Sequence, residues 1–364
     1  MLRLSAKSES NRLLIPVLTL AEPLAIIMKN ISIILILFIS NLIFCQEKFD
    51  NEKEIENIQS YNIEEINKKV DEKITIFGTL LTPKSDYNKI LVIISGTGKT
   101  SQKAHNYLTK YLLENKIGVF KFDKRGVGKS TGEYNDQPKI YTNDFIEIYS
   151  EFKNSKFTKN KKIGFLGHSL GGIVTTLSIE QNVKPDFLIQ WSAPIGKPRE
   201  LLKYQIENGI KNYDKLIIGK STEERINALN YVYELIDQNP NKSAWDLWKI
   251  GKKESKKVNV NKKSFSNYLM PHNVEFARID NTKTYQNIDF PTLVIIGKED
   301  ILVDSEQSKT ELNKIGNTNI EFKEIEKLDH FMTKKGTNQL TNKIYDIDAS
   351  FKEYLVNWII ELKK

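Results

Sequence analysis

The chain alternates between short, continuously hydrophobic runs and longer amphipathic segments. Short hydrophobic runs bounded by turn residues are typical of strands that are buried on both faces of a sheet. Seven such runs predict strands, at residues 74–81, 90–94, 118–122, 163–166, 187–191, 291–297 and 320–325. Because most of these runs are hydrophobic throughout, we expect a mostly parallel sheet.

The segments between these runs predict helices that cover the sheet. The predicted helices include residues 103–114, residues 142–152, a helix that starts near Leu170, a helix that ends near Gly316, and a last helix at 349–362. Strands that alternate with helices form βαβ units. The predicted fold class is therefore α/β, with a mostly parallel, doubly wound sheet.

One turn in this pattern carries candidate chemistry. The fourth hydrophobic run leads through Gly167-His168-Ser169-Leu170-Gly171, a G-x-S-x-G motif, into a predicted helix. This is the layout of a nucleophile elbow, in which the serine has a strained backbone and its neighbours must be small. The amide of Leu170, at the start of the helix, would face negative charge that develops beside Ser169.

The five-residue motif alone is a weak signal, because glycine and serine are common in tight turns. Its context is more specific. Nine of the 18 glycines of the chain lie in three short segments, each after a predicted strand, at residues 96–98, 126–132 and 164–172. The three glycine-rich segments at strand ends favour the interpretation of the Ser169 turn as part of an active site over a simple strand-to-helix connection.

A nucleophilic serine needs a histidine base and a carboxylate that orients it. Of the four histidines, His330 follows the last predicted strand in a loop before the last helix, where such a base belongs in this fold. The acid should lie between the serine and the histidine in sequence. We expect Asp300, directly after the sixth run, with Glu299 and Asp304 as alternatives.

These segments resemble the α/β-hydrolase superfamily, and within it a bacterial group of exported, esterase-like serine hydrolases. The resemblance rests on Ile94-Ser95-Gly96-Thr97-Gly98, the segment 122–132, the elbow, and residues 291–300. It implies a second oxyanion donor after the early strand, the amide of Thr97 or alternatively that of Gly96. It also implies structural roles for Asp123 and Arg125.

The regular alternation stops between residues 195 and 285, where helices are predicted at 200–208 and 223–237 and no buried strand is evident. An insertion between two strands is most simply a helical cap over the strand ends, where ligands bind in open α/β sheets. A separate partner-binding domain is the alternative. We favour the cap because both its ends emerge at the edge that carries Ser169.

The sequence thus divides into five predicted parts. Residues 1–45 are an N-terminal extension with a signal peptide, and residues 46–73 are an N-terminal extension of the mature chain with one short helix near 63–70. Residues 74–194 and 286–364 are the two parts of the hydrolase core, and residues 195–285 are the cap.

The signal peptide is predicted from Met28-Lys29-Asn30, followed by a 15-residue apolar run that ends at Cys45 and by the polar Gln46. A charged start, a short apolar stretch and a polar boundary are typical of secretory signals. We therefore expect an exported protein, periplasmic or secreted, with Met28 as an alternative start. Lipid anchoring at Cys45 is less favoured, because the bulky Phe44 precedes it. No membrane span is expected in the mature chain.

The composition of the chain bears on which partners and cofactors are expected. The net charge of +8 comes from lysines spread along the chain, so we expect no nucleic-acid site. A single cysteine excludes an internal disulfide and a cysteine-based metal site, and no cofactor is implied. Two glycine segments, at residues 96–100 and 126–130, resemble phosphate-binding loops, but both lack the first glycine of that motif.

The predicted function is hydrolysis of a carboxylic ester with a small or medium acyl group, through Ser169, Asp300, His330 and an acyl-enzyme. The oxyanion would be held by the amides of Leu170 and Thr97. A serine peptidase acting on short peptides is the first alternative. A non-catalytic binding protein that keeps the fold is the second.

Overall fold

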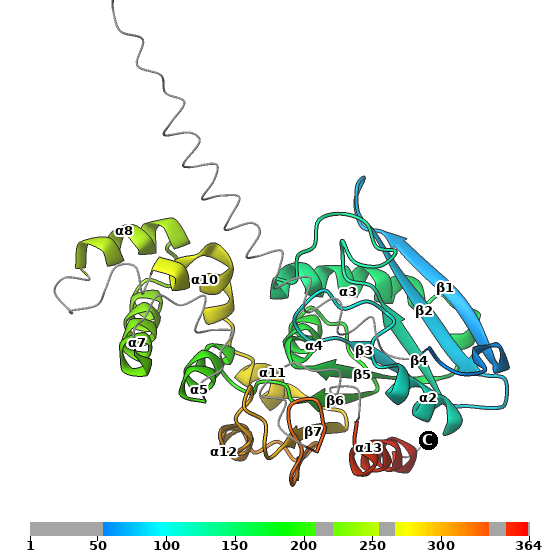
Figure 1. Ribbon diagram of the computed structural model, residues 1–364. Coiled ribbons are helices and arrows are strands. Elements are labelled where there is room, and N and C mark those ends of the chain that lie inside the picture. The colour runs from blue at the N-terminus through cyan, green and yellow to red at the C-terminus, as the bar shows by residue number, and fades with distance from the viewer. Residues whose placement is uncertain (1–53, 209–220, 255–265, 335–346, 363–364) are drawn as a thin grey trace, which may run out of the picture. The chain divides into compact units, whose positions relative to one another are not determined.

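The computed structural model describes residues 54–208, 221–254, 266–334 and 347–362. Its centre is an eight-stranded sheet with the order β1-β2-β4-β3-β5-β6-β7-β8 (Figure 1). Strands β1 and β2 are antiparallel to each other, β2 is antiparallel to β4, and the other neighbours are parallel. The predicted α/β class with a mostly parallel sheet is confirmed.

The seven predicted strands are all present. The structure gives their bounds as β2 (Thr75–Pro83), β3 (Lys89–Ile94), β4 (Ile117–Phe122), β5 (Lys162–His168), β6 (Phe187–Trp191), β7 (Thr292–Gly297) and β8 (Ile320–Ile325). Strands β3 to β7 are buried at nearly every position, which is why they are hydrophobic throughout.

The sheet begins earlier than predicted. The segment in which a short helix was expected near residues 63–70 is instead strand β1 (Tyr61–Lys69), preceded by the 3₁₀ turn η1 (Ile58–Ser60). All nine residues of β1 pair with β2 in register from Tyr61 opposite Pro83 to Lys69 opposite Thr75. The helix prediction was wrong because an edge strand with one solvent-facing side is rich in charged residues, and here their spacing imitates a helix.

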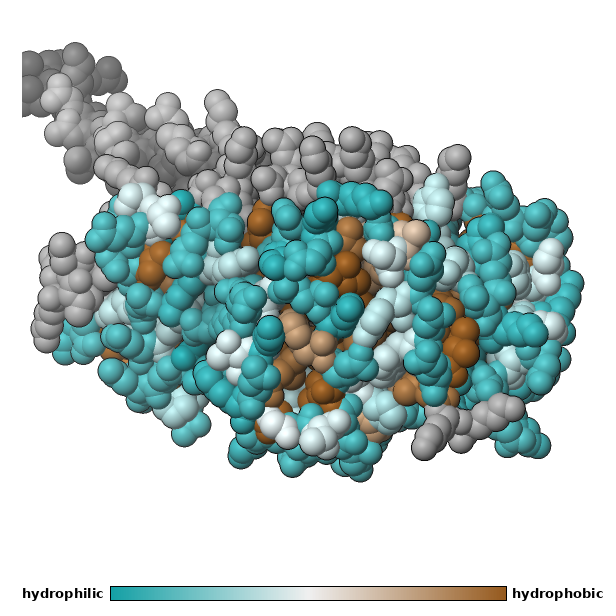
Figure 2. Space-filling model, turned by 90° about the horizontal axis from the view of Figure 1, so that it is seen from below, coloured by the Kyte–Doolittle hydropathy of each residue, from teal (hydrophilic) through white to brown (hydrophobic). Residues whose placement is uncertain are grey.

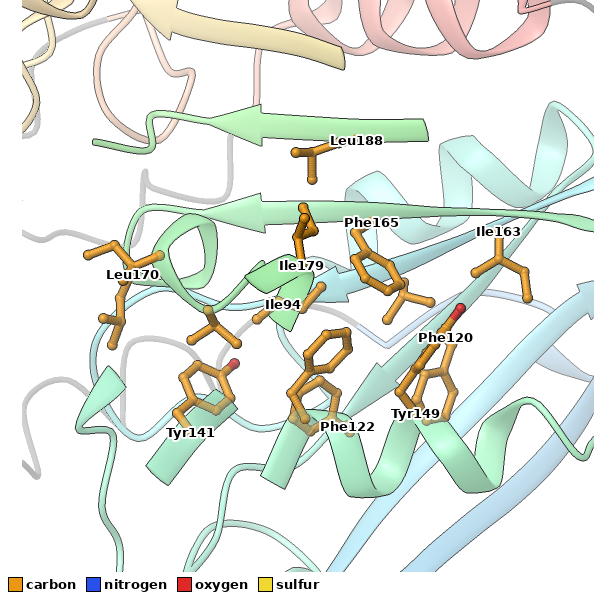
Figure 3. Close-up of a cluster of buried hydrophobic side chains, with 14 of the residues drawn as sticks. Ile94, Phe120, Phe122, Tyr141, Tyr149, Ile163, Phe165, Leu170, Ile179 and Leu188 are labelled. Carbon is orange, nitrogen blue, oxygen red and sulfur yellow. The ribbon is translucent and has the colours of Figure 1, made fainter. Parts of the chain in front are cut away.

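Helices cover both faces of the sheet. One face is packed against α3 (Pro138–Phe152), α4 (Leu170–Glu180), α11 (Thr282–Asn287) and α12 (Ser305–Ile315). The other is packed against α2 (Asn106–Glu114) and α13 (Ala349–Glu361). Figure 3 shows the first of these cores, in which aromatic rings of β4 and α3 meet aliphatic side chains of the neighbouring strands. The two cores hold the strand ends in place from both sides.

Residues between β6 and β7 form helices and no strand in the parts that the structure describes. These elements are η3 (Pro198–Glu200), α5 (Leu201–Glu207), α7 (Thr222–Gln238), α8 (Ala244–Glu254), η4 (Asn267–Leu269) and α10 (Pro271–Ala277). They have a hydrophobic core of their own, centred on α7. We call this set of elements the cap.

The two ends of the cap are tied together by one buried side chain. Asn281 is completely buried, its amide donates to the Pro194 carbonyl at 3.0 Å, and its side-chain oxygen accepts from the Gly196 amide at 2.7 Å. A backbone hydrogen bond from Asn281 to Gly196 completes the tie at 2.9 Å. The cap therefore leaves and re-enters the core at one point.

Hydrophilic residues cover most of the face shown in Figure 2, and hydrophobic residues appear there in small separate groups. A search of the described ranges for a long apolar helix that could cross a membrane finds none. The predicted signal peptide and the mature N-terminus at Gln46 lie outside the described residues.

Candidate active site

Ser169 lies at the sharp turn between strand β5 and helix α4. Its backbone has φ 53° and ψ −117°, a conformation that non-glycine residues rarely adopt, and helix α4 begins at the next residue. The Ser169 amide donates to the Trp191 carbonyl at 2.9 Å, and the Ser169 carbonyl accepts from Gly172 at 2.9 Å. The strained strand-to-helix turn predicted from the sequence is present.

The neighbours of Ser169 have no room for a side chain. A β-carbon on Gly167 would lie 2.6 Å from the α-carbon of Gly172, and one on Gly171 would lie 2.0 Å from the Ile94 carbonyl oxygen. Contacts this short are forbidden. The glycines of the motif are therefore required by the close approach of α4 to β3 and β5, as the elbow predicts.

Asp300 follows β7, and the two oxygens of its carboxylate have different partners. Its Oδ2 atom lies 2.9 Å from Nδ1 of His330, while its Oδ1 atom accepts hydrogen bonds from the Leu302 and Val303 amides at 2.8 and 2.9 Å. The residue is 1% exposed. These amides hold the carboxylate in one orientation, with one oxygen facing the imidazole.

The alternative acids are placed elsewhere. Glu299 is exposed to solvent. Asp304 caps helix α12, where its side chain accepts from the Glu306 and Gln307 amides. Among the three candidates, Asp300 is therefore the one that the structure brings to His330.

His330 lies in the loop after β8, and several groups fix its position. Its carbonyl accepts a hydrogen bond from Nε1 of Trp191 at 3.2 Å. The adjacent Asp329 is buried and accepts hydrogen bonds from the Phe331 amide at 3.0 Å and from the Thr333 amide at 2.9 Å. The loop can approach the Asp300 loop because Gly297 has no side chain, since a β-carbon there would lie 2.3 Å from the Leu328 carbonyl oxygen.

The elbow and the His330 loop meet through His168. The imidazole centroid of His168 lies 5.0 Å from that of His330 and 4.3 Å from the ring of Trp191, on which it stacks. His168 directly precedes Ser169 in the chain. The structure thus brings Ser169, His330 and Asp300 to the same edge of the sheet, from the ends of β5, β8 and β7.

His168 and His105 form a buried aromatic group with Trp191. The ring of His105 is 5.6 Å from that of His168 and 5.3 Å from that of Trp191. Burial lowers the pKa of His105 to about 3, with a further contribution from the charge of Lys121. Burial, followed by the nearby His330 and His105, also holds the pKa of His168 well below its usual value. Both residues are therefore neutral supports of the site at physiological pH.

The expected second oxyanion donor lies in the loop after β3. A β-carbon on Gly96 would be 3.2 Å from the β-carbon of Ser169, so this loop passes directly beside the serine. Thr97 follows and is exposed to solvent. Leu170 opens α4, and the amides of the first helical turn have no partner within the helix. The loop after β3 and the first turn of α4, which carry the expected donors, therefore flank Ser169.

Asp123 and Arg125 have structural contacts, as expected. Asp123 accepts from the amides of Gln102 and Lys129 at 2.7 and 2.9 Å, and a β-carbon on Gly128 would be 2.5 Å from its carboxylate. Arg125 forms a two-pronged pair with Asp144, at 2.6 and 2.5 Å. These contacts brace the loop after β4 and leave Asp123 apart from the His330 pair.

Sequence reasoning missed a contribution of the cap. The Tyr204 hydroxyl on α5 donates to the Asp300 carbonyl at 2.8 Å, and the Gln205 side chain donates to the Leu302 carbonyl at 3.0 Å. No motif marks these residues, because they act on backbone carbonyls. The described residues contain no group of three or more histidine, cysteine or carboxylate side chains suited to a metal ion.

The sheet order, the elbow and the paired Asp300 and His330 define an α/β hydrolase of the serine type. The family model described as "Serine aminopeptidase, S33" matches residues 85–334, more than half of the chain. The chain therefore belongs to this family, and it is a serine hydrolase of the α/β fold.

Solved structures share the fold at low sequence identity. The Pyrococcus furiosus esterase Pf2001 has a TM-score of 0.53 and 18% identity, over 85% of this chain and 96% of the esterase. The Pyrococcus horikoshii acylaminoacyl peptidase has a TM-score of 0.51 and 12% identity, over 85% of this chain and 43% of the peptidase. No curated protein has a significantly similar sequence.

Proposed function

We propose that the protein hydrolyses carboxylic esters with small or medium acyl groups, through Ser169, His330 and Asp300. The observation that carries the proposal is the 2.9 Å contact between Nδ1 of His330 and Oδ2 of Asp300, at the sheet edge that presents the strained Ser169. A carboxylate on Nδ1 holds the proton there and leaves Nε2 as the base.

The reaction then follows the chemistry of acyl transfer. Nε2 of His330 takes the proton of the Ser169 hydroxyl as its oxygen attacks the ester carbonyl, and the Leu170 and Thr97 amides stabilise the oxyanion. His330 gives that proton to the leaving alcohol as the acyl-enzyme forms. Water repeats these steps, which release the carboxylic acid and restore Ser169. Asp300 stabilises the imidazolium of His330 during both formation and hydrolysis of the acyl-enzyme.

The experiment is hydrolysis of p-nitrophenyl esters of increasing acyl length by wild type and Ser169→Ala. We expect turnover of acetate or butyrate esters that falls by about a thousandfold or more in the variant. Labelling of Ser169 by a fluorophosphonate probe provides an independent readout. Equal rates would remove Ser169 from the mechanism, and absence of both turnover and labelling would favour a non-catalytic binding protein.

The second candidate function is cleavage of short peptides, favoured by the family description as serine aminopeptidase. The same residues would act on an amide, with His330 protonating the leaving amine. Release of an N-terminal residue from dipeptides or tripeptides, with no turnover of esters, would support this function over the first.

We further propose that the protein is exported and that residues 1–45 are removed as it is exported. The support is the charged, then apolar, then polar pattern of that segment. Mass spectrometry of the mature protein is expected to find an N-terminus at Gln46. A lipid-modified N-terminal Cys45 would instead show that the protein is anchored to a membrane.

A further inference from the structure

A buried ammonium group lies behind the loop that passes beside Ser169. Nζ of Lys124 donates hydrogen bonds to the Gly96 carbonyl at 2.5 Å and to the Gly98 carbonyl at 3.0 Å. It lies 3.8 Å from the Asp136 carboxylate and 4.5 Å from the ring centroid of Tyr141. The Lys124 side chain is 1% exposed. Burial of a charge at this depth is expensive unless it has such partners.

The loop is held from several directions. The Asp136 carboxylate accepts from the Gly98 amide at 2.9 Å, and the Tyr141 hydroxyl donates to the Ser95 carbonyl at 3.3 Å. Lys124 is bonded to the two carbonyls that flank Thr97. Rotation of either peptide unit would break one of these bonds and leave a buried charge with fewer partners.

The contact with Gly96 determines which way the Thr97 amide faces. The peptide bond between Gly96 and Thr97 is trans, so its carbonyl and its N–H point in opposite directions. With the carbonyl of Gly96 directed at Lys124, the N–H of Thr97 faces away from the ammonium group. The α-carbon of Gly96 is the part of this loop that lies beside Ser169.

We propose that Lys124 is a positioning residue for oxyanion stabilisation: it holds the Gly96–Thr97 peptide so that the Thr97 N–H is presented to the substrate oxygen at Ser169. The inference rests on the proposed hydrolase function and assigns a residue that acts through the loop, without touching substrate. The Lys124 charge also reaches the elbow, because it contributes, after burial and the two nearby histidines, to the lowered pKa of His168.

The test is Lys124→Met, which removes the ammonium group and keeps an unbranched apolar side chain. We expect kcat for a p-nitrophenyl ester to fall by about 10- to 100-fold with KM changed by less than about threefold, because the loss is confined to the transition state. A trifluoromethyl ketone, which adds Ser169 and places an oxyanion at this site, should bind more weakly by a similar factor.

Lys121 offers a matched control. It is also a buried lysine of the β4 region, 5% exposed, and its ammonium group donates to the Ala104 carbonyl at 2.9 Å and to the Asn106 side chain at 2.8 Å. Lys121→Met should lower the melting temperature by a comparable amount while kcat and the inhibitor affinity stay within about twofold of wild type. A purely structural role of Lys124 predicts the same behaviour for both variants.

Lys124→Gln keeps the experiment decisive where the methionine variant does not fold, since its amide can still donate to one carbonyl. An intermediate loss of kcat and of inhibitor affinity is expected. Wild-type kcat and inhibitor affinity in either folded Lys124 variant would overturn the inference. The proposed function fails separately, if wild type shows no turnover that depends on Ser169.

Discussion

Gly96 and Ser169, which are 73 positions apart in the chain, face each other so closely that a β-carbon on residue 96 would lie 3.2 Å from the β-carbon of Ser169. The same added atom would be 3.3 Å from the His168 carbonyl oxygen and 3.5 Å from Nδ1 of His168. The loop after β3 and the elbow after β5 therefore form one continuous surface. A single methyl group at position 96 would intrude on it.

Gly96→Ala should lower kcat/KM for an ester by about tenfold or more, because the added methyl group displaces either the serine or the Thr97 amide. Its effect on stability should be small, about 1 kcal/mol, as for mild overpacking. Gly118→Ala is the control, since a β-carbon there meets Ile90 at 3.1 Å and Thr82 at 3.2 Å within the sheet. Equal losses of activity in the two variants would contradict a specific role for Gly96.

Asp300→Asn should fold normally and lose about 10³- to 10⁴-fold in kcat. The asparagine oxygen can accept from the Leu302 and Val303 amides, as Oδ1 of Asp300 does at 2.8 and 2.9 Å. Its NH₂ group then faces Nδ1 of His330 and selects the tautomer that places the proton on Nε2. Steady-state kinetics and a thermal melt measure the two effects.

The control for this variant is Glu299→Gln, the adjacent and exposed carboxylate. Its kcat should stay within about twofold of wild type, as for ordinary surface substitutions. A loss of activity at Glu299 that matched the loss at Asp300 would reassign the acid.

Tyr204→Phe should lower kcat by about two- to tenfold, the equivalent of one hydrogen bond, because the Asp300 carbonyl loses its bond from the cap. Tyr233→Phe removes a hydroxyl of the same kind, which donates to the Arg199 carbonyl at 2.6 Å within the cap. That variant should lower thermal stability with kcat unchanged. If both variants retain wild-type kcat, the hydrogen bond from α5 to Asp300 does not contribute to the reaction.

Stability should fall as pH falls below 6.5, because His105 and His168 stay neutral when folded but take up a proton when unfolded. Burial is the main cause of both lowered pKa values, with that of His105 at about 3. The unfolded chain therefore binds more protons, so acid favours unfolding down to the folded pKa. Each histidine should contribute about 1.4 kcal/mol of loss between pH 7.5 and 5.5.

His105→Asn should remove about half of this pH dependence in denaturant titrations at fixed ionic strength. Asparagine suits the position because His105 has a φ of 61°, a left-handed conformation that asparagine tolerates well. The contribution of other groups is common to both proteins and cancels in the comparison. An unchanged slope between pH 7.5 and 5.5 would show that His105 is already protonated in the folded protein.

The sheet and the site residues were predictable to different degrees. Strands β3 to β7 were recognisable because burial on both faces demands continuous hydrophobic runs, and Phe165 and Ile189 are examples that are completely buried. Strand β1 was not, since Ile66 is buried but its neighbours Glu65 and Asn67 face solvent. Its pairing with β2 depends on tertiary contacts that local sequence does not express.

The placement of Ser169, Asp300 and His330 could be anticipated because parallel strands all end at one edge, so chain order translates into proximity. The residues that hold the loops of the site from outside, such as Tyr204 and Lys124, could not be anticipated from the sequence. Tyr204 donates to the carbonyl of Asp300, 96 positions along the chain, and Lys124 donates to the carbonyl of Gly96, 28 positions away. Neither contact belongs to a local motif, because every residue of the chain has a carbonyl that can accept a hydrogen bond.

The hydrogen bonds of Asn281 with Pro194 and Gly196 join the two ends of the cap. Pro194, Gly196 and Asn281 are joined at the base of the cap. We therefore expect strands β6 and β7 to pair whatever the sequence between these residues. For the same reason, we expect substitutions and insertions between Gly196 and Asn281 to leave the ends of β6 and β7 in place. The chain between these two points is thus free to vary while the sheet that positions Ser169 stays unaltered.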